Sequence, residues 1–190
     1  MKKTPIIGIV VAALAYIAMY ILGAASGLIH PACFAYAGTV LPLLFAFCYL
    51  YAAANLRCFG AALLLNGLCM LVALVMGEGN APLIIGMLLL AALAELIRMR
   101  CGYDTLRGVR RSFLPLAFSF YAYTAHWWTN TAESLAEAVE EMPAGYAAKM
   151  EQVIGNMPLL LVMLLLTVPV ALLGMYLAEK LMKRQRKKLR

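Results

Sequence analysis

The run Ile6-Ile-Gly-Ile-Val-Val-Ala-Ala-Leu-Ala-Tyr-Ile-Ala-Met-Tyr-Ile-Leu22 carries no charged side chain and follows shortly after Lys2 and Lys3. It is longer than the roughly 7–15 apolar residues of a secretory signal peptide, so we interpret it as a membrane span that stays in the protein. The rest of the chain is also apolar: 65% of its 190 residues are hydrophobic and 13% are charged, with a mean hydropathy of +0.86. A soluble domain of this length could not bury so much apolar surface.

Six apolar segments are long enough to cross the hydrocarbon core of a bilayer, which takes about 20 residues. They are Pro5–Ala25, Ala32–Ala53, Phe59–Met76, Ala81–Ile97, Phe113–Trp128 and Pro158–Ala178. Glycine, proline or charge interrupts each gap between them. The sequence therefore predicts an all-α membrane protein with six transmembrane helices in one domain that covers residues 1–190.

The basic residues predict the orientation of these spans. If the N-terminus is inside and the spans alternate, fifteen of the sixteen lysines and arginines fall on the inner side, and only Lys149 falls outside. Cytoplasmic loops of membrane proteins are enriched in lysine and arginine. We therefore expect both termini to be cytoplasmic, with a basic tail over about residues 180–190 lying on anionic lipid. The net charge of +7 then reflects topology, and no nucleic acid partner is expected.

The stretch over about residues 130–157 is the one long loop, and it would lie outside. Asn130-x-x-Glu133 and Ser134-x-x-Glu137 are typical of helix starts. Apolar residues then recur at helical spacing on either side of Pro143-Ala-Gly145, namely Leu135, Val139 and Met142 before it and Tyr146, Met150 and Val153 after it. We predict two short amphipathic helices that lie apolar side down as a lid. The alternative is a polar loop whose helices fray.

The sequence gives no sign of an enzyme. It has no His-Glu-x-x-His, Gly-x-Ser-x-Gly or P-loop motif, and its five cysteines show neither metal-ligand nor redox spacing.

Glu95 precedes Arg98 by three residues, which predicts a local ion pair at the inner interface. Asn66, in the middle of the third apolar segment, is expected to donate to another helix. Because the sequence has no P-loop, any ATP-driven work would require partner subunits.

The segment Ser119–Asn130 gathers polar and aromatic side chains at the outer end of the fifth span. Ser119, Tyr123, His126 and Asn130 are spaced by four, three and four residues and would form one stripe of a helix. Such a stripe should face protein or a water-filled cavity, which would make these residues, with Trp127, a binding site. The alternative is an aromatic belt at the membrane interface, which accounts well for the two tryptophans.

The other histidine, His30, lies in the first outer loop, and Tyr36 follows nearby. Two imidazoles on one side of the membrane, His30 and His126, are a candidate pair of ligands for a metal or a haem iron. No intrinsic cofactor is expected.

Small residues recur along one side of the first span at Gly8, Ala12, Ala15 and Ala18. Small side chains let another helix approach closely. The stripe fits internal packing and docking of a partner subunit equally well.

Four stretches carry a resemblance to a known family. They are Ala94-Glu-Leu-Ile-Arg-Met-Arg-Cys-Gly-Tyr103, Phe120-Tyr-Ala-Tyr-Thr-Ala-His-Trp-Trp128, the acidic loop that ends in Tyr146-Ala-Ala-Lys149, and Leu173-Gly-Met-Tyr-Leu-Ala-Glu-Lys180. Through them the chain resembles the substrate-binding (S) components of energy-coupling factor (ECF) transporters, and more narrowly the branch first noted in treponemes and streptococci.

The resemblance implies a membrane subunit that captures a micronutrient at the outer face, a vitamin or a metal species such as haem. It implies docking on a transmembrane coupling subunit with two ATPase subunits. The family docks through a small-residue stripe, often Ala-x-x-x-Ala, where this chain has Gly8-x-x-x-Ala12. The expected ligand-binding residues are Ser119, Tyr123, His126, Trp127, Asn130, His30 and Tyr36. The competing hypothesis is a non-transporting membrane scaffold or chaperone subunit that binds partner helices.

Overall fold

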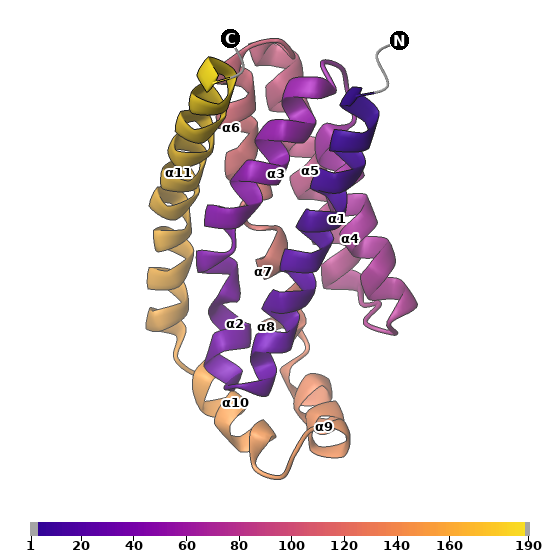
Figure 1. Cartoon of the computed structure of the whole chain (residues 1–190). Coiled ribbons are helices and arrows are strands. Elements are labelled where there is room, and N and C mark those ends of the chain that lie inside the picture. The colour runs from indigo at the N-terminus through magenta and orange to yellow at the C-terminus, as the bar shows by residue number, and fades with distance from the viewer. Residues whose placement is uncertain (1–3, 189–190) are drawn as a thin grey trace.

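Every secondary-structure element in the described part of the chain, residues 4–188, is helical in the computed structural model of the protein. The elements are α1 (Thr4–Ala25), η1 (Ser26–Leu28), α2 (Pro31–Val40), α3 (Pro42–Asn55), α4 (Ala61–Val75), α5 (Ala81–Cys101), α6 (Leu106–Leu116), α7 (Ser119–Thr124), α8 (His126–Thr129), α9 (Thr131–Glu141), α10 (Tyr146–Ile154) and α11 (Met157–Lys188). Figure 1 shows an elongated bundle with both chain ends at one end and α9 and α10 at the other. We call these the terminal end and the lid end.

Within residues 4–188, three helical stretches are long and apolar enough to cross a membrane: Ile6–Leu28, Ala81–Cys101 and Met157–Lys183. The pair α2 and α3 adds a fourth if it counts as one bent span. The helix α4 is apolar but shorter. The protein is therefore a membrane-embedded helical protein with several spans, and the count of six and the orientation stay predictions. The basic tail continues α11 as far as Lys188, and residues 189–190 lie outside the described part, as do Lys2 and Lys3.

The second apolar segment is not one continuous helix, which corrects the sequence prediction for Ala32–Ala53. The chain bends by 43° between α2 and α3. Pro42 begins α3 and has no N–H group for the carbonyl of the preceding turn, so the helix cannot run straight through it. Gly174 of α11 passes this bend so closely that a Cβ there would lie 2.9 Å from the Pro42 carbonyl oxygen. The backbone of α11 at Gly174 is thus in close contact with the backbone at the bend.

The fifth apolar segment is broken as well, so Ser119–Asn130 is not one helix face. Pro115 sits near the end of α6, and the chain turns at Ala117 and Phe118 before α7 begins. A second break at Ala125 separates α7 from α8. Just before it, the Thr124 hydroxyl donates to the carbonyl of Phe120 at 3.3 Å, a contact type that bends helices.

A polar cluster lies in the bundle core around Asn66. Its amide donates to the Met87 carbonyl at 3.2 Å, which confirms the predicted bond to another helix. Its Oδ1 lies 3.0 Å from Ser119 Oγ and accepts from the Tyr16 hydroxyl at 3.4 Å. All three side chains are buried, so the cluster ties α1, α4, α5 and α7 together by bonds that lipid cannot replace.

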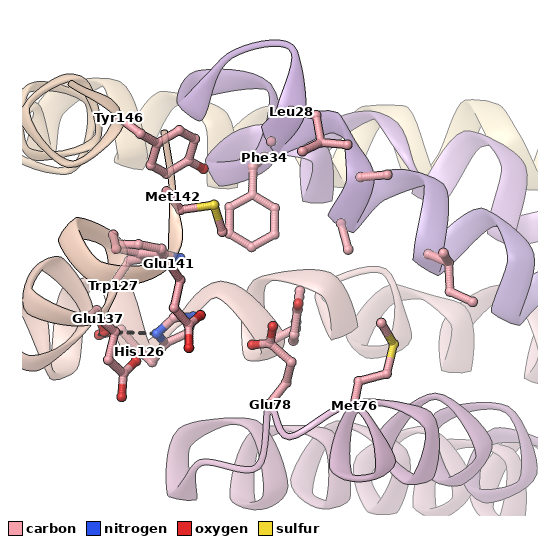
Figure 2. A pocket seen from close by; sticks show the side chains of 17 residues that line it. Leu28, Phe34, Met76, Glu78, His126, Trp127, Glu137, Glu141, Met142 and Tyr146 are labelled. Carbon is pink, nitrogen blue, oxygen red and sulfur yellow. Dashed lines mark hydrogen bonds between the residues drawn. The ribbon is translucent and has the colours of Figure 1, made fainter. Parts of the chain in front are cut away.

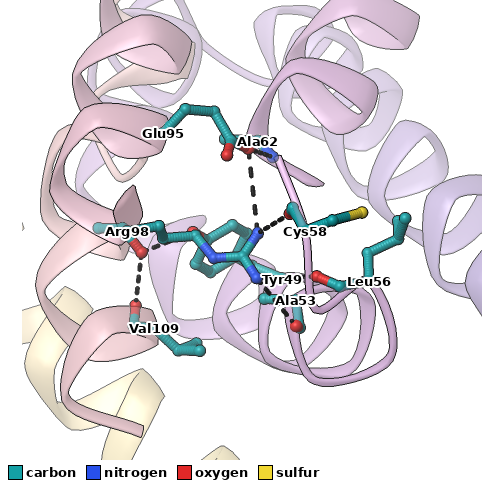
Figure 3. A network of polar contacts seen from close by, with 9 residues as sticks. Tyr49, Ala53, Leu56, Cys58, Ala62, Glu95, Arg98 and Val109 are labelled. Atoms are coloured by element: carbon teal, nitrogen blue, oxygen red, sulfur yellow. Dashed lines mark hydrogen bonds and ion pairs between the residues drawn. The ribbon is translucent and has the colours of Figure 1, made fainter. Parts of the chain in front are cut away.

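A second polar cluster fixes the junction between α3 and α4 near the terminal end (Figure 3). Arg98 and Glu95 form the predicted pair, 4.0 Å apart, and both side chains are fully buried in the protein. Glu95 Oε1 accepts from the Ala62 backbone N–H at 2.7 Å, at the start of α4. The Arg98 guanidinium donates to the carbonyls of Ala53, Leu56 and Cys58. The two charges therefore satisfy backbone groups that helix ends leave unpaired.

Candidate functional site

A cavity of about 300 Å³ lies at the lid end. Its walls come from the end of α1, η1, α2, the α4–α5 loop, α7, α8, α9 and α10 (Figure 2). Its size is at the lower end of the range for pockets that hold small organic ligands. Elements far apart in sequence thus meet around one partly open space.

Aromatic rings form one wall of the cavity. Phe34 of α2 packs edge-on against Tyr123 of α7, with ring centroids 5.7 Å apart, and against Trp127 of α8, at 6.4 Å. Tyr146 of α10 also lines the space. Interlocked edge-to-face rings hold their orientation, so this wall is largely formed before any ligand enters.

His126 joins the cavity wall to the lid. Its Nδ1 lies 2.9 Å from the hydroxyl oxygen of Ser134 in α9, and its ring lies 5.0 Å from that of Trp127. The Thr131 hydroxyl, at the start of α9, donates to the Trp127 carbonyl at 2.8 Å. The first turn of α9 is therefore bonded to α8, while the residues beyond Glu140 as far as Gly145 are exposed.

Three carboxylates line the cavity: Glu78 of the α4–α5 loop, and Glu137 and Glu141 of α9. In Figure 2 the side chains of Glu78 and Glu141 extend into the same space from different walls. Burial, followed by the charges of Glu141 and Glu137, raises the pKa of Glu78 above its ordinary value. The acids are thus close enough to act on one another.

The two predicted lid helices are confirmed, as is the break between them at Pro143-Ala-Gly145. On α10 the predicted face packs inward, with Met150 fully buried. On α9 the structure corrects the prediction, because Ser134 and Ala138 are buried while Val139 is 70% exposed. The predicted helix start at Ser134 is also wrong, since α9 begins at Thr131. The buried face of α9 is therefore the one that contacts α8 and the cavity, and the spacing of its apolar residues does not predict it.

The structure separates the residues predicted to bind ligand. Tyr123, His126 and Trp127 line the cavity. Asn130 lines a neighbouring space that shares His126 with the cavity. Ser119 is not among the lining residues, because it is buried in the core beside Asn66.

The two remaining predicted residues have structural contacts instead. The Tyr36 hydroxyl donates to the carbonyl of Val153 at 3.1 Å and so fastens α10 to α2. His30 is exposed and caps α2, where its Nδ1 accepts from the Ala32 N–H at 3.1 Å. Neither residue is among those that line the cavity.

Sequence reasoning missed Glu78 and Phe34 as cavity residues, and it gave Glu137 and Glu141 no part in binding. Glu78 carries a signal in hindsight, since it is the one charged residue between the apolar stretches of α4 and α5. Phe34 carries none, because an apolar side chain in an apolar helix looks like any other.

The small-residue stripe on α1 is divided between two surroundings. Gly8 faces Tyr51 of α3, whose hydroxyl oxygen would lie 2.0 Å from a Cβ at this position. Ala12 is buried and Ala15 is half-buried. Of the four, Ala18 alone is exposed, so docking of a partner through the whole stripe would compete with packing inside this chain.

In the part of the chain that the structure describes, no three His, Cys, Asp or Glu side chains are arranged to hold a metal ion. The three cavity carboxylates come from the α4–α5 loop and from two turns of α9.

The apolar helices define an integral membrane protein, and a partly open cavity lies at one end of its bundle. Over residues 4–188 the chain matches the family described as "Hypothetical bacterial integral membrane protein (Trep_Strep)", and it belongs to that family. Comparison with curated proteins and with solved structures gives no match. Family membership agrees with the resemblance to the treponeme and streptococcal branch.

Proposed function

We propose that the protein is the substrate-binding membrane subunit of an ECF-type importer in the bacterial cytoplasmic membrane. It would capture a small molecule in the lid-end cavity and release it on the other side. The observation that supports this most is the partly open, aromatic cavity that α9 and α10 border, two helices that fold over one end of a membrane bundle. A pocket that is mostly apolar with a few directed polar groups is the usual form of a ligand site.

The lid supplies a route for entry and exit. One end of α9 is bonded to α8 through His126 and Thr131, while the link to α10 is exposed. Movement of α9 about its bonded first turn would open the cavity without breaking the core clusters around Asn66 and Arg98. Lid movements of this kind set access and release in many binding proteins.

The energy for transport would come from partners. The sequence has no P-loop, so we propose that a transmembrane coupling subunit with two ATPase subunits drives release, and that this chain is not itself an enzyme. Affinity purification from the native membrane should recover these subunits. Recovery of other membrane proteins without any ATPase would instead favour the scaffold hypothesis.

Haem fits the cavity poorly as a ligand. The space is small for a porphyrin, three carboxylates would repel its propionates, and His30 is not among the lining residues. A vitamin-sized molecule fits better. The absorption spectrum of the purified protein checks this, since a Soret band in freshly isolated material would restore haem as the ligand.

The binding site is tested with the double variant Tyr123→Ala/His126→Ala. The intact protein, purified in mild detergent, is weighed by native mass spectrometry to find any small molecule that stays bound. Because both side chains line the cavity, we expect the bound fraction to fall at least about tenfold, which corresponds to about 1.4 kcal/mol of binding free energy.

The matched control is His30→Asn/Tyr176→Ala. It changes the same two residue types at positions that do not line the cavity, and asparagine keeps a capping group at the start of α2. We expect the control to retain ligand as the wild type does. Equal retention by the cavity variant and the control would refute the proposed site.

A further inference from the structure

The charges around the cavity are of one sign. Glu78, Glu137 and Glu141 line it, and among the described lining residues there is no lysine or arginine. Positive charges are plentiful elsewhere in the chain, with sixteen lysines and arginines against nine acids. The cavity is thus an acidic pocket in a basic protein, and it would attract a positively charged guest.

The same space has aromatic walls. Phe34, Tyr123, Trp127 and Tyr146 all contribute side chains to its lining. The face of an aromatic ring attracts a cation through its quadrupole, most strongly where water is excluded, and aromatic cages are a common means of binding alkylammonium groups. Rings and carboxylates therefore favour the same class of guest independently.

An inorganic cation fits less well. The described residues contain no three-ligand group suited to a metal, and carboxylates from the loop after α4 and from α9 surround the space broadly. Aromatic rings are poor partners for a hard metal ion that needs oxygen ligands at short range. A cation with an organic body would use both the rings and the dispersed charge.

Trp127 has a buried hydrogen-bond donor beside the cavity. It is only 5% exposed, it lines the cavity, and its indole Nε1 has no hydrogen-bond partner in the described part of the chain. A buried donor without an acceptor is costly, so it is expected to be satisfied in the working state. Because the nitrogen itself is buried, an acceptor on the guest would reach it only after a movement of the indole ring.

We propose that the lid-end cavity takes an organic cation, an amine or quaternary ammonium compound with an aromatic or hydrocarbon body. This inference rests on the proposed binding function and specifies its ligand class. The body lies against Phe34 and Tyr123, and the positive group lies between Glu78 and Glu141. Anionic compounds of the same size are excluded by the three carboxylates.

The test uses three probes of matched size and different charge: 2-phenylethylamine, 2-phenylethanol and 3-phenylpropanoate. Thermal unfolding of the purified wild-type protein is followed at pH 7 and low salt with increasing amounts of each probe. A compound that binds only the folded state raises the melting temperature in a concentration-dependent way. We expect a rise with the amine and none with the alcohol or the acid.

The carboxylates are tested with Glu78→Gln/Glu141→Gln, for which Glu140→Gln/Glu151→Gln is the control. Both variants lose two negative charges, but Glu140 and Glu151 do not line the cavity. We expect the cavity variant to weaken amine binding at least about tenfold and the control to bind as the wild type does. If the cavity variant is unstable, the single variant Glu141→Gln gives the same comparison with Glu140→Gln.

The outcomes separate this inference from the proposed function. A response to the alcohol or the acid equal to that of the amine, or no response to the amine, would overturn the organic-cation assignment. A small molecule that stays bound through purification and is lost in Tyr123→Ala/His126→Ala would still support the binding function. The binding function itself would be overturned if no small molecule stayed bound to the wild type and if Tyr123→Ala/His126→Ala retained as much of it as the control His30→Asn/Tyr176→Ala.

Discussion

Replacing Arg98 by methionine should show how much the buried cluster at the α3–α4 junction stabilises the fold. Arg98 is fully buried. Its guanidinium donates to three backbone carbonyls, those of Ala53 at 3.0 Å, Leu56 at 2.8 Å and Cys58 at 3.4 Å. Methionine fills similar space but leaves these carbonyls unpaired and Glu95 without its cation.

The magnitude follows from the burial of the pair. Removing one partner of a buried ion pair costs about 3–5 kcal/mol, because the other charge stays in a low-dielectric site. For a chain of this length, each kcal/mol lowers the melting temperature by roughly 2–4 °C. We therefore expect Arg98→Met to melt roughly 6–20 °C below the wild type.

The assay is thermal unfolding in mild detergent, followed by intrinsic tryptophan fluorescence. Arg100→Met is the matched control, because Arg100 lies on the same helix two residues further along and is exposed. The double variant Glu95→Gln/Arg98→Met should recover part of the loss, since it removes the uncompensated carboxylate. If Arg98→Met and Arg100→Met melt together, the cluster does not stabilise the fold as we infer.

Two further predictions concern the α11 contact and the acidic cavity. Gly174→Ala should destabilise the protein by about 1–3 kcal/mol, because a Cβ would lie 2.8 Å from the Leu43 Cα. Gly67→Ala is the control, and it should be neutral or slightly stabilising because nothing lies within 4 Å of a Cβ there. Equal melting temperatures of the two variants would contradict the close contact. Burial and the nearby carboxylates raise the pKa of Glu78, so its ionised form costs stability above that pKa, and the cost disappears as pH falls below the ordinary value of a glutamate. The melting temperature of Glu78→Gln should therefore be above that of the wild type at pH 7 and equal to it at about pH 3.5. A lower melting temperature of the variant at pH 7 would show that a partner stabilises the carboxylate instead.

Much of the architecture could be predicted from the sequence because it depends on local patterns. Apolar run length indicates spans, and it correctly located α1, α5 and α11. Capping signals and the Pro143-Ala-Gly145 break located the two lid helices. Helical continuity was less predictable, since Pro42 and Pro115 lie inside runs whose hydropathy alone suggests unbroken spans.

The candidate site was predicted in part, for a related reason. Tyr123, His126 and Trp127 lie at the cavity because they share a short stretch of chain near the lid. Ser119 lies in the same helix as Tyr123 but one turn further from the lid end, where it contacts Asn66 in the core and does not reach the cavity. Spacing along a helix identifies a common face, but it does not give the depth at which a cavity ends.

What the sequence by itself determined is the solvent of this protein: a chain so apolar, with its charges confined to gaps and ends, must place most of its helices in lipid. What only the tertiary structure decided is the chemistry of the pocket. Glu78 and Glu141 come from a loop and a lid helix far apart in the chain, and Phe34 comes from a third element. Packing brings such residues together, and no local pattern records which distant side chains will share a cavity.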